Sequence, residues 1–237
     1  MKLPLLALFS ILSFPLALPA HAIVNGRVAP NGSLINKATV MVRTGVGLCS
    51  GTLLANDIVI TAAHCLKGIG GGITVHFGVQ GERGERPVTR FRSNPGYRGD
   101  WANDMAILRF AGGAPRGSSP VAALDESPGN IPAGRTIIAA GYGDTQANVG
   151  ETDTLRYAPL EIIGTRGDQV LLRGRGTSTC FGDSGGPAFL EHEGEMILFG
   201  VVSGSLTTSQ SCGGTLVFNR LDAHGDWIAN TIKDLRR

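Results

Sequence analysis

Gly182-Asp183-Ser184-Gly185-Gly186-Pro187 sets one serine among glycines, and it is the most informative stretch of the chain. Glycine has no Cβ, so a carbonyl group could approach the Ser184 hydroxyl without meeting neighbouring side chains. Backbone N–H groups beside such a serine can face an oxygen that becomes negative during acyl transfer. The stretch therefore indicates a nucleophilic serine, whereas a serine among glycines without suitable partners is an ordinary turn.

A serine hydroxyl is a weak nucleophile, which needs a base that is itself oriented by an acid. The segment TAAHC at 61–65 supplies a histidine at the end of an expected strand. The segment NDMAIL at 103–108 places an aspartate just before a buried strand. We therefore take His64, Asp104 and Ser184 as candidate base, orienting acid and nucleophile.

Other residues compete for these roles. Asp100 is a second acid before the expected strand Met105–Phe110, but it lies further from that strand, so Asp104 is favoured. A lone histidine is more often a core or surface residue than a base. We assign that ordinary role to His76, His192 and His224.

Composition limits the class of protein. The 237 residues are 42% hydrophobic and 17% charged, with a formal net charge of +2. That hydrophobic fraction is enough for a packed core and excludes a disordered chain. The near balance of charges gives no electrostatic case for binding nucleic acid or an anionic membrane. The 35 glycines, with little helical periodicity, predict short strands joined by tight turns.

Alternating or β-branched runs recur in two sets, separated by a Gly/Pro/Ser-rich stretch at 111–120. Two sets of about six strands predict an all-β fold of two small β-barrels. The first set is Ala38–Arg43, Leu48–Leu54, Asp57–Thr61, Ile73–Phe77, Pro87–Phe91 and Met105–Phe110. The second set is Arg135–Tyr142, Thr154–Ile163, Gln169–Arg173, Gly186–Leu190, Glu195–Ser203 and Thr215–Arg220.

Only the segment Asp222–Arg237 has a helical pattern. Trp227, Ile228 and Ile232 share one face, and Asp222 is a candidate N-cap. Basic residues at the far end suit the negative end of the helix dipole. We therefore expect one C-terminal helix.

The first 22 residues are typical of a cleaved export signal. Lys2 precedes an apolar run, Leu3–Pro19, and Ala20-His21-Ala22 is a small-x-small cleavage signature. Prolines within the run and the lack of a polybasic flank disfavour a permanent membrane anchor. We expect a secreted protein, extracellular or periplasmic, with no membrane attachment after cleavage. The expected units are the signal peptide (1–22) and a mature domain (23–237) made of an N-terminal barrel (about 23–115), a C-terminal barrel (121–221) and the terminal helix (222–237).

Export places the four cysteines in an oxidising compartment, where an even number indicates two disulfides. A zinc site needs closely spaced pairs such as C-x-x-C, which the sequence lacks. Four cysteines allow three pairings. We favour Cys49–Cys65 and Cys180–Cys212, because each closes a local loop, worth on the order of 3 kcal/mol.

Taken together, these motifs resemble the chymotrypsin/trypsin family of serine endopeptidases, from Ile23 to about Arg237. The resemblance implies two perpendicular six-stranded antiparallel β-barrels with a C-terminal α-helix and an active site in the cleft between the barrels. The disulfide pattern of the family agrees with the favoured pairings. The matching motifs, in the order of the family, are IVNG at 23–26, TAAHC at 61–65, NDMAIL at 103–108, GYG at 141–143, CFGDSGGP at 180–187, VSG at 202–204 and DWI at 226–228.

The resemblance also implies roles for residues. His64 would be the general base, Asp104 would orient it, and Ser184 would be the nucleophile. The N–H groups of Gly182 and Ser184 would form the oxyanion hole.

In this family a freed amino terminus pairs with the aspartate before the nucleophile, which here means Ile23 with Asp183. The Ala20–Ala22 signature abuts Ile23 directly. We therefore expect signal peptidase itself to create the active terminus, with no zymogen stage. Cleavage further upstream, leaving a short prosegment, is the alternative.

The sequence departs from the family around the primary specificity pocket. Ser178 stands where trypsin-like members have an aspartate, Gly204 stands where a tryptophan is usual, and Thr215 or Leu216 could intrude into the pocket. No Asp or Glu occurs at 169–182 or 200–221. Because a buried substrate cation needs an opposite charge, we predict an uncharged pocket for apolar or small side chains, with a polar or acidic preference as the alternative. The expected pocket residues are Ser178, Thr179, Ser203 and Ser205.

The predicted function is peptide-bond hydrolysis through an acyl-enzyme. The α/β-hydrolase alternative requires the chain order serine, acid, histidine, which differs from the order here. A catalytically silent binding protein of the same fold is the other alternative, although such proteins typically lose a triad member. We expect polypeptide substrates, a protein inhibitor as a further candidate partner, a monomer, no cofactor and no metal. Glu82 and Glu85 lie where some relatives hold calcium, but exposed acids in such a loop are more often solvated.

Overall fold

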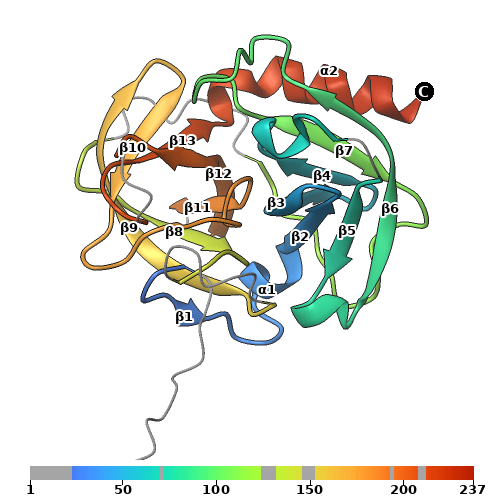
Figure 1. Ribbon diagram of the computed structural model, residues 1–237, viewed down its shortest axis with the longest axis horizontal. Coiled ribbons are helices and arrows are strands. Elements are labelled where there is room, and N and C mark those ends of the chain that lie inside the picture. Colours follow the sequence, from blue (N-terminus) through green and yellow to red (C-terminus); the bar gives the residue numbers. More distant parts are fainter. Residues whose placement is uncertain (1–22, 70–71, 124–131, 146–152, 193–194, 208–211) are drawn as a thin grey trace, which may run out of the picture.

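The computed structural model describes residues 23–69, 72–123, 132–145, 153–192, 195–207 and 212–237. The expected signal peptide, 1–22, lies outside these residues. Two β-barrels lie side by side in this part of the chain (Figure 1). No helix within the described ranges is long and apolar enough to cross a membrane.

The first barrel closes in the strand order β2-β3-β4-β7-β6-β5, with antiparallel pairs throughout. Apolar side chains from all six strands fill it, and the rings of Phe77 and Phe110 meet edge to face at 5.5 Å. One ring comes from β5 and the other from β7, two strands that are separated by β6 in the ring, so the contact lies inside the barrel. The strands are β2 (Thr39–Thr44), β3 (Gly47–Ala55), β4 (Ile58–Thr61), β5 (Thr74–Phe77), β6 (Gly84–Ser93) and β7 (Ala106–Phe110).

The second barrel closes in the order β8-β9-β10-β13-β12-β11, since β11 pairs back with β8. A short strand, β1, pairs with β9 outside the ring. The core of the second barrel includes Ile23, the first residue of the described chain. The strands are β1 (Arg27–Val28), β8 (Thr136–Gly141), β9 (Arg156–Arg166), β10 (Gln169–Arg173), β11 (Pro187–His192), β12 (Glu195–Ser205) and β13 (Leu216–Arg220).

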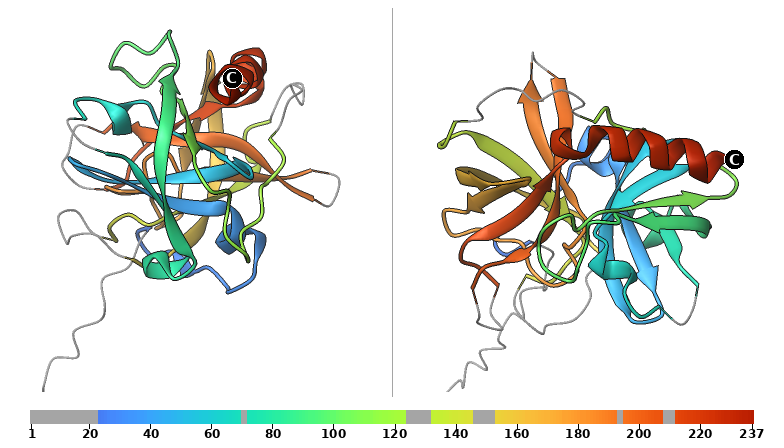
Figure 2. Two further views of the ribbon diagram at one scale, coloured as in Figure 1. Left: turned by 90° about the vertical axis from the view of Figure 1, so that its right-hand side faces the viewer. Right: turned by 90° about the horizontal axis from the view of Figure 1, so that it is seen from above.

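The C-terminal helix α2 (Gly225–Arg236) follows the second barrel in sequence but packs on β6 and β7 of the first (Figures 1 and 2). Ile228, Thr231 and Leu235 form its buried face. The guanidinium groups of Arg90 and Arg109 each donate to the Leu235 carbonyl at 2.9 Å. The helix therefore ties the two barrels together.

The predicted start of this helix was wrong. Asp222–His224 forms a separate 3-10 turn, η3, and α2 begins at Gly225 with His224 at the N-cap position. The Asp222 carboxylate accepts from Arg220 Nε at 3.0 Å instead of capping the helix. The Asp222 carboxylate therefore binds the Arg220 guanidinium and does not accept from the first N–H groups of the helix.

Short elements also escaped the sequence reasoning. Helix α1 (Leu34–Ala38) begins after Ser33, whose hydroxyl accepts from the Asn36 N–H at 3.2 Å. A five-residue helix is too short to display a period, so only this cap could have indicated it. The other such elements are β1 and the 3-10 turns η1 (His64–Leu66) and η2 (Val79–Gly81).

Candidate active site

His64 and Asp104 meet where two paired strands of the first barrel, β4 and β7, adjoin their loops. His64 opens η1, directly after β4, and Asp104 lies just before β7, which pairs with β4. The ring Nδ1 of His64 is 2.7 Å from Asp104 Oδ2, and its backbone N–H donates to Oδ1 at 2.8 Å. Because Nδ1 faces a carboxylate it carries the proton, so the neutral ring has Nε2 free to accept one.

The Asp104 side chain is fully buried, and a third donor reaches it. The Ser203 hydroxyl, on β12 of the second barrel, donates to Asp104 Oδ2 at 2.5 Å. Sequence reasoning placed Ser203 in the specificity pocket, and the structure places its hydroxyl on the acid. Asp100, the competing acid, accepts from the Ala102 N–H at 3.2 Å within its own loop.

Ser184 lies on a turn that presses closely on the first barrel. Gly185 has φ +82°, and a Cβ there would come within 2.4 Å of the Ser50 carbonyl oxygen. The Ser50 N–H donates to the Ser184 carbonyl at 2.8 Å, and the Ser50 hydroxyl donates to the Gly182 carbonyl at 2.9 Å. Glycine at 185 is therefore required by both the backbone angle and the space.

The same turn places the Ser184 backbone near the disulfide that also contacts His64. The disulfide sulfur Cys65 Sγ lies 3.8 Å from His64 Nε2 and 3.8 Å from the Ser184 carbonyl oxygen. Both residues therefore flank one sulfur atom, that of the Cys49–Cys65 disulfide. The second disulfide joins Cys180, at the start of the turn, to Cys212.

The backbone directions of the turn follow from its carbonyl partners. The Phe181 carbonyl accepts from the Asp144 N–H at 2.7 Å, and the Asp183 carbonyl accepts from the Gly186 N–H at 2.9 Å. A trans peptide places its N–H opposite its C=O. The N–H groups of Gly182 and Ser184 therefore point away from these internal bonds.

Asp183 is fully buried on the other side of the turn. Its Oδ1 accepts from the Gly143 N–H at 2.9 Å and its Oδ2 from the Cys180 N–H at 2.8 Å. The Ile23 backbone N–H also bonds to it. Burial outweighs these bonds and raises the pKa of the Asp183 carboxyl to about 7.

The Ile23 segment is held in place by backbone pairing. The Val24 N–H donates to the Ser178 carbonyl at 2.9 Å, and the Ser178 N–H returns a bond at 3.3 Å. The Ile23 side chain is fully buried in the second barrel. The structure thus brings together the residues of the predicted activation pair, Ile23 and Asp183.

The residues expected to line the primary pocket have varied surroundings. Ser178 and Thr179 are buried, and the Ser178 hydroxyl donates to the Thr179 carbonyl at 2.9 Å. The Ser205 hydroxyl donates to the Gly213 carbonyl at 2.8 Å. Leu216 lies opposite Ser205 in the β12–β13 pair and is buried in the barrel core.

Trp101 is a residue that sequence reasoning missed. It precedes Asp104 on the same loop, and a Cβ at Gly204 would lie 2.6 to 2.9 Å from three of its ring atoms. The indole of Trp101 therefore covers the backbone of β12 where Gly204 has no side chain. The absence of the usual tryptophan at 204 was a signal that another aromatic residue could fill this space.

One cluster among the described residues has the spacing of a metal site, Cys49, His64 and Cys65. Its two sulfurs are joined in a disulfide, so neither is available as a thiolate ligand. His64 is already bonded to Asp104. The cluster is therefore part of the His64–Ser184 arrangement and does not fit a metal ion.

Comparisons with known proteins identify the family of this chain. The sequence pattern that describes the Trypsin family matches residues 23–228. The chain belongs to the trypsin family. It is 30% identical to human serine protease 56 over 88% of this chain and 38% of that protein, so it spans less than half of that relative.

Two further similarities cover most of both chains. The chain is 31% identical to the trypsin-like protease of Streptomyces glaucescens, over 78% of this chain and 74% of that protein. The structure of mouse neuropsin, a serine protease, matches with a TM-score of 0.74 at 25% identity, over 89% of this chain and all of that one. The predicted fold, two six-stranded antiparallel barrels with a C-terminal helix, is confirmed.

Proposed function

We propose that this chain is a serine endopeptidase that hydrolyses peptide bonds with His64, Asp104 and Ser184. The observation that carries the proposal is the bond from His64 Nδ1 to the buried Asp104, with Nε2 and the Ser184 carbonyl oxygen each 3.8 Å from one disulfide sulfur. A base so oriented can take a proton from an adjacent hydroxyl. Family membership supports this assignment.

In the proposed reaction, the Ser184 hydroxyl oxygen attacks the peptide carbonyl carbon while His64 Nε2 takes the hydroxyl proton. The charge of Asp104 stabilises the imidazolium that forms, and the N–H groups of Gly182 and Ser184 bind the negative oxygen. The C–N bond then breaks as His64 returns the proton to the leaving amine. Water, activated by His64, hydrolyses the acyl-enzyme by the same steps.

The substrate preference we propose is apolar or small at the primary pocket. Ser178 stands where a trypsin-like enzyme has its charged group. The buried Leu216 lies on β13, opposite the expected pocket residue Ser205 of β12. Exposed apolar side chains at Trp101, Phe181 and Leu206 add apolar surface near the turn and β12. Profiling on a peptide library should show little cleavage after Arg or Lys, and a profile dominated by these residues would overturn the assignment.

We further propose that residues 1–22 direct export and that their removal frees the amino group of Ile23. The Ile23 nitrogen lies beside the buried Asp183 carboxyl, whose pKa is raised by burial. An ammonium at this position would supply the opposite charge that the carboxylate needs. The pair would hold the turn at Gly182–Ser184 in its productive form. N-terminal sequencing of the secreted protein tests the cleavage site, and a start upstream of Ile23 in an inactive product would indicate a prosegment.

The test of the catalytic proposal is covalent labelling of the exported, processed protein by a serine-directed phosphonate. The parent should be labelled, and Ser184→Ala should be neither labelled nor active. Ser119→Ala, in a surface loop, is a matched control and should be labelled like the parent. A processed parent that resists labelling would instead indicate a silent binding protein.

A further inference from the structure

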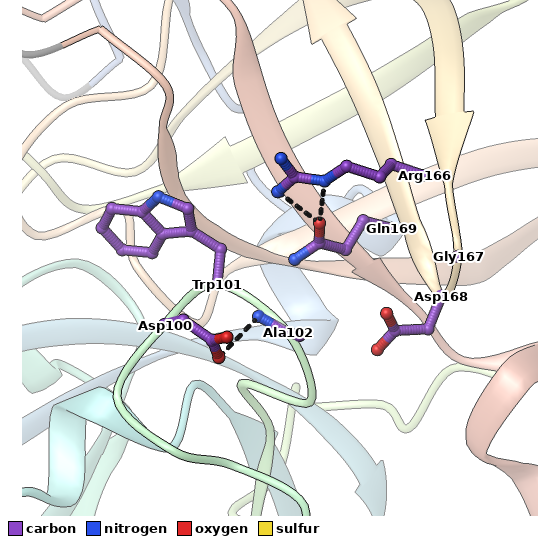
Figure 3. Close-up of a pocket in the computed structure, with 7 residues that line it drawn as sticks. All are labelled: Asp100, Trp101, Ala102, Arg166, Gly167, Asp168 and Gln169. Atoms are coloured by element: carbon purple, nitrogen blue, oxygen red, sulfur yellow. Dashed lines mark hydrogen bonds between the residues drawn. The ribbon is translucent and has the colours of Figure 1, made fainter.

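The loop that carries Asp104 runs from β6 of the first barrel to β7, but its anchors come from the second. This loop, residues 94–105, approaches the hairpin turn between β9 and β10, and Figure 3 shows Trp101 and Asp168 on the two sides of a surface hollow. Asn219 Nδ2, on β13, donates to the Trp101 carbonyl at 3.0 Å. The loop is therefore fixed by residues far away in sequence.

Asp168 makes the central contact. Its Oδ2 accepts from the Asn103 N–H at 3.2 Å and lies 2.9 Å from His224 Nε2. It occupies the two-residue turn between β9 and β10, and its own carbonyl accepts from the Arg220 N–H at 2.9 Å. A carboxylate on so short a turn is held in one position by the barrel.

His224 extends the contact to the other end of the loop. Its side chain is largely buried, and because Nε2 faces the Asp168 carboxylate, Nε2 carries the proton. Nδ1 then accepts from Asn94 Nδ2 at 3.4 Å, while Asn94 Oδ1 accepts from the Gly96 N–H at 2.8 Å. A neutral His224 thus satisfies both neighbours and links the first residue of the loop to Asp168.

The backbone beside Asp104 requires such support. Asn103 has φ +54°, in the left-handed region, which residues other than glycine adopt only with support from their surroundings. Its N–H is the group that Asp168 binds. Without that bond Asn103 can relax to a negative φ, and this rotation would move Asp104, the next residue, relative to His64.

We propose that Asp168 and His224 are positioning residues, which act through Asn103 to hold Asp104 against His64. This inference rests on the proposed function, in which Asp104 orients the catalytic base. Neither residue contacts the reacting atoms. Their effect is on the rate of the chemical step rather than on substrate binding.

The primary test is the kinetics of Asp168→Ala. A displacement of about 1 Å in a catalytic group lowers rates by up to roughly 100-fold, so kcat should fall by about 10- to 100-fold with KM nearly unchanged. Asp168→Asn keeps an oxygen that can accept from Asn103 and should restore most of the rate. Asp222→Ala removes another bonded acid of the same region that does not contact the loop, and should leave kcat near the parent value.

A double-mutant cycle separates positioning from general destabilisation. If Asp168 acts through Asp104, then Asp168→Ala should lower kcat no further in a chain that already carries Asp104→Asn. The proposal would be overturned if the two substitutions lowered kcat by the product of their separate effects. It would also be overturned if Asp168→Ala alone left kcat unchanged. Should Asp168→Ala not fold, His224→Phe removes the ring N–H that donates to the Asp168 carboxylate, with little change of volume, and carries the same expectations.

The His64 Nδ1 proton provides a readout that does not need turnover. Its NMR resonance reports the bond to Asp104, and it should shift in Asp168→Ala but not in Asp222→Ala. Absence of phosphonate labelling in the parent would refute the proposed function, and this resonance would still test the positioning. An unchanged resonance would refute the positioning alone.

Discussion

Asp104 and Asp183 are both fully buried, on opposite sides of the Ser184 turn, yet they are bonded differently. Asp104 accepts from two side chains, His64 and Ser203, as well as from a backbone N–H. The donors that reach Asp183 are backbone N–H groups, and burial raises the pKa of Asp183 to about 7. Burial costs a carboxylate most when no opposite charge accompanies it.

The difference indicates two uses for a buried acid. Asp104 faces a ring that gains and loses a proton during the proposed reaction, so its counter-charge is temporary. Asp183 faces the Ile23 nitrogen, which is a neutral amide while residue 22 is attached and an ammonium after cleavage. One acid would serve each catalytic cycle, and the other would respond once to processing.

The largest effect is expected when the charge of Asp104 is removed. Asp104→Asn presents an amide to His64 Nδ1 and favours the wrong tautomer, so kcat should fall by roughly 10⁴-fold. Steady-state kinetics on a peptide substrate measures this. Asp100→Asn is the matched control, and a comparable loss there would mean that the acid was assigned wrongly.

A smaller loss is expected when Asp183 keeps a neutral partner. One residue added before Ile23 turns the ammonium into an amide, and activity should fall by about 10²-fold, the cost of an incomplete oxyanion hole. Asp183→Asn in the processed form should lose a similar amount. The two changes together should cost no more than either alone, and full activity with an extended terminus would falsify the activation pair.

Local motifs predicted most of the fold and the candidate triad because the relevant signals lie close together in sequence. Strand runs such as Gln169–Arg173 have their period written in consecutive residues, and this strand has the predicted bounds. The cysteine pairs close local loops, which the structure contains. His64, Asp104 and Ser184 each lie in a short motif of the family.

The parts that sequence reasoning missed depend on contacts between distant residues. The Ser203 hydroxyl reaches Asp104 from the other barrel, and Trp101 covers the backbone at Gly204. Neither contact leaves a local pattern. The same reason explains why His224 looked like an ordinary histidine, since its link to the Asp104 loop passes through Asp168.

Ser203 offers a sharper test of the bonding at Asp104. Ser203→Ala removes one donor to a charged acceptor while two others remain, so kcat should fall by about tenfold with KM unchanged. Ser205→Ala, two residues along β12, is the control for a role in the pocket. A change of side-chain preference in Ser203→Ala, without loss of kcat, would return Ser203 to the specificity pocket.

The smallest effect concerns stability against pH, and it distinguishes the two forms of Asp183. With an extended terminus, the folded Asp183 holds its proton up to a pKa of about 7, whereas the ordinary value is 3.8. The free energy of unfolding should therefore fall as pH rises from about 4 through 7, because the unfolded chain releases this proton first. In the processed form, the Ile23 ammonium favours the charged carboxylate and lowers its pKa, which removes this decline. The pKa of the ammonium is itself raised above its free value near 8, so stability of the processed form should fall only as pH rises through that higher value.

Thermal unfolding midpoints of the two forms, measured between pH 4 and 9, should differ by a few degrees, since 1 kcal/mol corresponds to about 2–4 °C in a domain of this size. Asp183→Asn in the extended form should flatten the decline between pH 4 and 7. Curves that run parallel in both forms would show that the Ile23 nitrogen does not control the charge of Asp183.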